Sequence, residues 1–121
     1  MEGFNKRRFP RASFPCSLMI WLDNNYETIL TKTANISAGG LLVHLNQAFM
    51  GGAKVEIKVD VSKEESFRCI GRVVRCQEIP QDSGGDQKLY AIALAFESLE
   101  EHKVAYLKAL VDKLLTQENM N

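Results

Sequence analysis

Strict alternation of apolar and polar side chains is the feature that most constrains how this chain can fold. In residues 54–61 every second side chain is branched and apolar: Val55, Ile57, Val59 and Val61. Successive side chains of a β-strand point to opposite sides, so the pattern predicts a strand with one buried face and one solvated face. The lysines on the polar face need no functional explanation, because solvation accounts for them.

Five further segments have the composition of strands: residues 14–22, 26–34, 41–45, 67–77 and 89–96. They are separated by a turn at 23–25, a loop at 35–40, a charged turn at 62–66 and a loop at 79–88 that is rich in glycine and aspartate. The first segment is apolar on both faces, which predicts a barrel strand whose outer side is covered.

Two strands carry more specific predictions. Gly71 interrupts the strand at 67–77 and indicates a bulge or a sharp bend. The strand at 89–96 places its bulky residues on one face: Tyr90, Ile92, Leu94 and Phe96. The other face carries only alanines, which would let a helix pack closely against it.

The predicted helix covers residues 98–117, and residues beyond about Gln117 should fray. Ser98 and Glu101 have the spacing of a capping box, and Glu100 would complement the positive end of the helix dipole. Apolar residues recur at helical spacing: Val104, Leu107, Leu110, Val111, Leu114 and Leu115. This stripe covers the barrel or meets a second protomer, so a homodimer through the helix stays open.

Six strands followed by one helix predict an all-β fold, a small closed antiparallel barrel with a C-terminal helix. With 121 residues the chain forms one domain of ordinary size. We divide it into an arm (1–12), a barrel (13–97) and a helix (98–117).

Composition excludes several classes of protein. The three cysteines, Cys16, Cys69 and Cys76, are odd in number and lack C-x-x-C spacing, so we expect reduced structural thiols. With only His44 and His102 in addition, we expect no metal site, no cofactor and no catalytic acid–base pair. No apolar run is long enough for a membrane span and no secretory h-region follows the basic start, so we expect a cytoplasmic protein without membrane insertion.

The basic arm holds four cations within six residues: Lys6, Arg7, Arg8 and Arg11, the last following Phe9-Pro10. Residues 1–12 therefore carry a net +3, with Glu2 as the single carboxylate, in a chain whose formal net charge is zero. Alone, such a segment is a flexible, solvated tail. Concentration of the cations in one short arm suits a small anion better than nucleic acid, which usually needs a basic face.

The loop at 35–40 is a second candidate for ligand contact, in addition to the basic arm. Asn35 and Ser37 stand two residues apart and can point the same way, and Gly39 and Gly40 permit positive φ and a close approach of ligand to backbone. Without further information this is a glycine-terminated turn.

Taken together, Arg7-x-x-x-Arg11 and Asn35-x-Ser37-x-x-Gly40 resemble the paired motifs of PilZ domains, R-x-x-x-R and D/N-x-S-x-x-G. The resemblance extends over nearly the whole chain. It implies a six-stranded β-barrel and binding of the bacterial second messenger cyclic di-GMP.

The resemblance also implies roles for the motif residues. Arg7 and Arg11, with Arg8 between them, would engage phosphates and guanine edges. Asn35 and Ser37 would reach guanine and the sugar–phosphate groups, while Gly40 and its neighbour Gly39 keep the backbone clear. Asn stands where Asp is commoner in the family, which removes a charge but keeps an acceptor oxygen. Lys6 would influence whether one ligand or a stacked pair is held.

The leading hypothesis is therefore a non-enzymatic receptor that changes its surface on binding and signals to an unidentified downstream protein in trans. The alternative is a PilZ adaptor that acts through protein contacts without ligand. A barrel that binds DNA or RNA is not expected, because the strand aromatics fall on core positions instead of forming exposed stacking platforms.

Overall fold

The computed structural model describes residues 14–22, 27–80 and 87–119, with side chains to residue 116. The arm (1–12) and the predicted turn at 23–25 lie outside the described residues. Six strands and one helix follow one another: β1 (Ser17–Leu22), β2 (Glu27–Ile36), β3 (Gly40–Leu45), β4 (Lys54–Asp60), β5 (Ser66–Ile79), β6 (Leu89–Glu97) and α1 (Glu101–Asn119).

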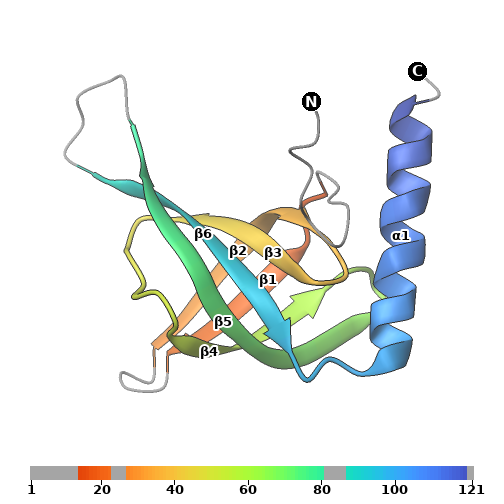
Figure 1. The fold of residues 1–121 in the computed structure, drawn as a ribbon, viewed down its shortest axis with the longest axis horizontal. Helices are drawn as coiled ribbons and strands as arrows, with labels where there is room; N and C mark the ends of the chain where they lie inside the picture. The colour runs from red at the N-terminus through yellow and green to blue at the C-terminus, as the bar shows by residue number, and fades with distance from the viewer. Residues whose placement is uncertain (1–13, 23–26, 81–86, 120–121) are drawn as a thin grey trace.

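The strands form a closed antiparallel barrel in the order β1-β2-β3-β6-β5-β4 (Figure 1). This confirms the predicted six-stranded barrel with its C-terminal helix. β2 runs two residues further than expected, to Ile36, and β5 is 14 residues long. The pairing of β3 with β6, between residues far apart in sequence, closes the barrel on the side where the candidate site lies.

The barrel interior is filled by the alternating apolar residues. Side chains that are almost completely buried come from all six strands: Leu18, Ile20, Ile36, Leu41, Val43, Ile57, Val59, Val73, Ile92 and Leu94. Two aromatic rings, Phe67 and Phe96, meet edge to face with centroids 5.4 Å apart. The inward faces predicted for β1, β4 and β6 are confirmed.

The outer side of β1 is covered as its two apolar faces suggested. The Arg68 guanidinium lies 4.8 Å from the centre of the Trp21 ring, a cation–π contact, and also pairs with Glu56 at 2.7 Å. A charged side chain of β5 thus shields the exposed face of an aromatic residue on β1.

The bulge in β5 does not fall at Gly71, for which the sequence indicated a bulge or a sharp bend. Gly71 pairs regularly with Val55 and Phe96, and the register shifts between Val73 and Arg75 instead. An added Cβ at Gly71 would stand 3.3 Å from Ile57 Cδ1, so the glycine is explained by limited space in the core. β5 nevertheless curves strongly around the barrel (Figure 1).

The helix begins later than the predicted capping box. Ser98 has a positive φ of 62° and turns the chain away from β6, and the first helical backbone bonds run to the Glu100 carbonyl. Glu100, not Ser98, therefore occupies the position before the helix.

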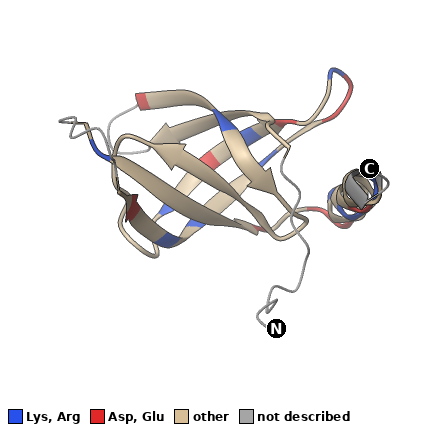
Figure 2. Ribbon diagram, turned by 90° about the horizontal axis from the view of Figure 1, so that it is seen from above, with Lys and Arg blue, Asp and Glu red and all other residues tan. Residues whose placement is uncertain are grey.

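α1 stands beside one end of the barrel, and Figure 2 shows it end-on. Leu107 is completely buried and belongs to the same cluster as the inward-facing strand residues, so the helix covers the barrel end and does not lie along the alanine face of β6. Burial of Leu107 contributes about 1.5–3 kcal/mol. A salt bridge adds to this contact: Lys103 Nζ lies 2.6 Å from Glu65 Oε2 and 2.9 Å from the Ser66 carbonyl oxygen.

The three cysteines are free thiols, as expected. Burial raises the pKa of Cys69 to about 11. Burial also raises the pKa of Cys16, against a smaller opposing effect of its hydrogen bond with Thr33. Both therefore stay protonated and uncharged at neutral pH.

Candidate functional site

The candidate site is built around the tight turn between β2 and β3. Asn35 and Ile36 belong to β2 and Gly40 begins β3, so the expected six-residue loop is reduced to residues 37–39. Ser37 N donates to the Gly40 carbonyl oxygen at 2.8 Å, which closes the turn. Asn35, Ser37, Gly39 and Gly40 thus lie in or beside one tight turn, and their role as ligand residues stays a prediction.

Ser37 is the centre of this turn. Its side chain is only 4% exposed, and its Oγ accepts hydrogen bonds from Gly39 N at 3.1 Å and from Gly40 N at 3.2 Å. The hydroxyl in turn donates to the Gly40 carbonyl oxygen at 3.2 Å. These bonds satisfy buried backbone groups, so in this structure Ser37 holds the turn in shape.

Gly40 is required for strand packing. A Cβ at this position would overlap the Leu94 carbonyl oxygen and stand 3.1 Å from Ala95 Cα, because β3 and β6 approach closely here. Neither Gly39 nor Gly40 uses the positive φ that the sequence permitted; among the described glycines only Gly52 does. Gly40 therefore has a role in pairing β3 with β6, and its role in clearing space for a ligand stays a prediction.

Asn35 differs from the rest of the turn. A bulge between Thr33 and Asn35 shifts the register of β2, so that Asn35 pairs with Leu42 while Thr33 and Ile36 are both buried. The side-chain oxygen of Asn35 is buried and has no hydrogen-bond partner. A buried acceptor without a partner costs about 1–3 kcal/mol, which a ligand with an N–H donor would recover.

A row of outward side chains continues from Asn35 across the barrel. Asn35 pairs with Leu42 on β3, Leu42 with Ala93 on β6, and Ala93 with Arg75 on β5, and directly paired residues share one face. Arg75 is exposed and carries a guanidinium that no carboxylate in the described part of the chain neutralises. Leu42, Ala93 and Arg75 could not be predicted as members of this row, because pairing between distant strands brings them together. The single signal in the sequence was their position on the outward side of their strands.

The base of the basic arm is fixed next to this turn. Thr33 Oγ1 donates to the Phe14 carbonyl oxygen at 3.0 Å and accepts from Cys16 N at 2.9 Å, and Thr33 N donates to the Cys16 carbonyl oxygen at 2.9 Å. Lys6, Arg7, Arg8 and Arg11 lie outside the described residues. Phe14 and Cys16, the first part of the chain after the arm that the structure describes, are thus held against the strand that carries Asn35.

Other chemistry is sparse in the described part of the chain. It contains no group of three or more His, Cys, Asp or Glu residues arranged to hold a metal ion. No described helix combines the length and the apolar character that a membrane span requires.

Comparison with solved structures reveals the same fold in three bacterial proteins. An inhibitor of motility from Bacillus subtilis (MotI/DgrA) superimposes with a TM-score of 0.76 at 19% identity, over 97% of this chain and 53% of its own. The PilZ domain of YcgR from Escherichia coli, solved with c-di-GMP, gives 0.73 at 16% identity, over 96% of both chains. The MrkH–c-di-GMP complex from K. pneumonia gives 0.74 at 17% identity, over 97% of this chain and 56% of that one.

The chain thus spans about half the length of the Bacillus inhibitor and of MrkH, and the low identities make these likenesses of fold. No curated protein matches it by sequence. The family model of the PilZ domain, however, matches residues 5–113, from the basic arm through most of the helix. The chain belongs to the PilZ domain family.

Proposed function

We propose that this chain is a receptor for cyclic di-GMP that signals to a partner protein in trans. The observation that carries the proposal is the buried, unpaired side-chain oxygen of Asn35, which lies beside the base of an arm with the R-x-x-x-R motif. Membership of the PilZ family and the c-di-GMP present in the YcgR and MrkH structures support it.

The chemistry of the basic arm and that of the barrel face at Asn35, the two halves of the proposed site, match the ligand. Guanine offers N–H donors for the Asn35 oxygen, and it offers O6 and N7 acceptors for the planar fork of an arginine. The two phosphates supply the anionic groups that Arg7, Arg8 and Arg11 would bind. Arg75 adds a further unneutralised cation at the far end of the row that begins at Asn35.

The energetics require both halves. Ordering about six arm residues costs roughly 6–12 kcal/mol of backbone entropy. Each hydrogen bond to a charged group returns about 1.5–3 kcal/mol. Three arginines with one or two such bonds apiece offset this cost, and micromolar affinity then needs a further surplus of about 8 kcal/mol. We propose that contacts on the barrel face, at Asn35 and along its row, supply the remainder.

The proposed output is a change of surface. Binding would draw the arm from solvent onto the β2–β3 side of the barrel, and a partner protein would read the ordered arm. No step in this scheme requires a catalytic residue, so we propose a non-enzymatic role.

Isothermal calorimetry with cyclic di-GMP tests the proposal. We expect micromolar binding, reduced at least tenfold by Arg11→Ala and by Asn35→Leu, which removes the acceptor while keeping the size of the side chain. Arg68→Ala, an arginine of the β1–β4–β5 side, is the matched control and should bind normally. Ser37→Ala is a poorer test, because loss of its turn hydrogen bonds would disturb the site indirectly.

The same titration distinguishes the proposed receptor from a PilZ adaptor that acts without ligand. An unmodified chain that gives no heat at high micromolar ligand, yet forms a stable complex with a partner protein, would be a ligand-independent adaptor.

A further inference from the structure

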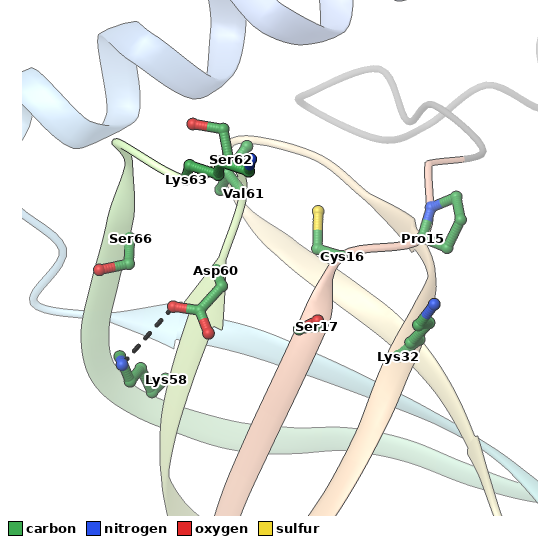
Figure 3. A pocket seen from close by; sticks show the side chains of 10 residues that line it. All are labelled: Pro15, Cys16, Ser17, Lys32, Lys58, Asp60, Val61, Ser62, Lys63 and Ser66. Carbon is green, nitrogen blue, oxygen red and sulfur yellow. Dashed lines mark ion pairs between the residues drawn. The ribbon is translucent and has the colours of Figure 1, made fainter.

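A second polar surface lies on the other side of the arm's base. A hollow of about 610 Å³ lies where β1, β2 and β4 meet the turn between β4 and β5, and Figure 3 shows the side chains that line it. Ten residues line it: Pro15, Cys16, Ser17, Lys32, Lys58, Asp60, Val61, Ser62, Lys63 and Ser66. We call it the lysine hollow.

Strand pairing builds its wall. Lys32 pairs with Ser17, Ser17 with Asp60, and Asp60 with Ser66, so these four residues form one outward row across β2, β1, β4 and β5. The buried side chains of Cys16 and Val61 contribute an apolar floor. Because burial keeps the Cys16 thiol protonated, the floor adds no charge of its own.

The charge of the hollow is positive. Of its three ammonium groups, Lys58 already pairs with Asp60, the single carboxylate, at 3.6 Å. Lys32 and Lys63 are exposed, and neither has a carboxylate partner within the ranges that the structure describes. Two positive charges therefore remain for an incoming anionic group.

The spacing of these charges favours an extended acidic segment over a small anion. Lys32 lies on β2 and Lys63 in the turn after β4, and these two strands stand on either side of β1, about 10 Å apart. In an extended peptide, carboxylates two or three residues apart are separated by about 7–10 Å. The hollow is also open, whereas small-molecule sites usually enclose most of their ligand.

The position of the hollow connects it to the arm and to the helix. Pro15 and Cys16 line the hollow, and they belong to the segment that hydrogen bonds to Thr33 hold in place. Thr33 lies between Lys32 and Asn35 along β2. Its opposite rim is the β4–β5 turn, whose Glu65 binds Lys103 of α1. The hollow therefore adjoins both the segment that follows the arm and the turn that contacts the helix.

We propose that the lysine hollow is the docking site for an acidic segment of the partner protein. This inference rests on the proposed function and extends it by naming the chemistry of the partner and where it binds.

The test uses a ten-residue peptide of alternating Glu and Ser, titrated into the ¹⁵N-labelled full chain at low salt. Amide shifts should concentrate at Ser17, Lys32, Ser62 and Ser66. The double variant Lys32→Glu/Lys63→Glu should weaken binding about tenfold or more, since two attractive charges become repulsive. Lys88→Glu/Lys113→Glu changes the net charge equally at exposed sites elsewhere and should weaken binding less than threefold.

Equal losses in both double variants would overturn the proposal, since net charge alone would then explain binding. Inorganic phosphate that binds as tightly as the peptide, with the same shifts, would overturn it in favour of a small-anion site. Calorimetry with cyclic di-GMP keeps the two proposals apart. A chain that binds the dinucleotide but fails the peptide test loses only this inference, and the converse result removes only the proposed function.

Discussion

Two turns of this barrel use the same serine contact in opposite environments. In the β2–β3 turn, Ser37 Oγ accepts from Gly40 N, three residues on, and in the β4–β5 turn Ser62 Oγ accepts from Glu65 N, also three residues on. The first serine is buried and the second is exposed. The first turn is held by buried hydrogen bonds between neutral groups, whereas the second is joined to the helix by the Lys103–Glu65 ion pair.

The difference suggests separate roles for the two turns: the β2–β3 turn positions Asn35, and the β4–β5 turn connects the barrel to the helix. Buried neutral hydrogen bonds fix a geometry independently of salt and pH, which suits the turn that carries Asn35. Partly exposed ion pairs respond to both conditions, which suits a joint between barrel and helix.

The largest expected effect comes from Gly40→Ala. The new methyl group would overlap the Leu94 carbonyl oxygen, so β3 and β6 must separate, and we expect a loss of about 3 kcal/mol or more in the free energy of unfolding. Gly51→Ala is the control, because a Cβ there meets nothing within 4 Å. Urea denaturation measures both. Equal midpoints would show that the close approach of these strands is not essential.

Replacing each turn serine by alanine tests the comparison directly. Ser37→Ala leaves the buried amide of Gly40 and the partly buried amide of Gly39 without their hydroxyl acceptor and should cost about 2 kcal/mol. Ser62→Ala should stay within about 0.5 kcal/mol, because water replaces the hydroxyl at an exposed site. Similar losses from chemical denaturation of the two variants would remove the distinction between the turns.

Loss of the Lys103–Glu65 ion pair between helix and barrel should destabilise the fold less, and its cost should depend on salt. Lys103→Met keeps the apolar stem but removes the bonds to Glu65 and to the Ser66 carbonyl, and we expect about 1 kcal/mol at low salt. Lys58→Met, whose pair with Asp60 is longer and more exposed, should cost less. Unfolding in 0.05 M and 0.5 M sodium chloride would measure this. A cost for Lys103→Met that does not fall with salt contradicts an ionic joint.

Acid should weaken ionic contacts at the end of β6 while the β2–β3 turn is unaffected. The pKa of Glu97 is lowered from about 4.5 chiefly by its hydrogen bond with Lys54, against desolvation and with help from Arg72. A carboxyl with a lowered pKa in the folded state stabilises the fold above its ordinary pKa, and this contribution disappears as the pH falls through the lowered value. The stability difference between the unmodified chain and Glu97→Gln should therefore shrink from pH 7 to pH 3. A difference that stays constant in that range would exclude the effect.

The parts of the fold that depend on local pattern could be predicted from the sequence. Alternation located the strands, the faces of β1 and β4, and the apolar stripe of the helix, because strand and helix periods are local properties. The start of the helix was misplaced, since Ser98 adopts a left-handed conformation that its residue type rarely favours. Gly71 indicated a bulge or a sharp bend because glycine is the usual marker of both, and the register shifts next to Val74 instead.

Residues whose roles depend on long-range pairing could not be predicted in this way. Gly40 is needed for its distance to β6, and the row from Asn35 to Arg75 exists only through the order of the strands. The paired motifs nevertheless identified the β2–β3 turn as the candidate site. The assignment of Arg7, Arg8 and Arg11 as ligand residues stays a prediction.

Closure of the barrel restricts how a partner can recognise this domain. β1 pairs with both β2 and β4, so this strand offers no unpaired row of backbone amides and carbonyls. Addition of a partner's strand to the sheet, a common mode of peptide recognition, is therefore blocked at β1. Recognition at β1 has to depend on its outward side chains, which can change without disturbing the backbone hydrogen bonds beneath them.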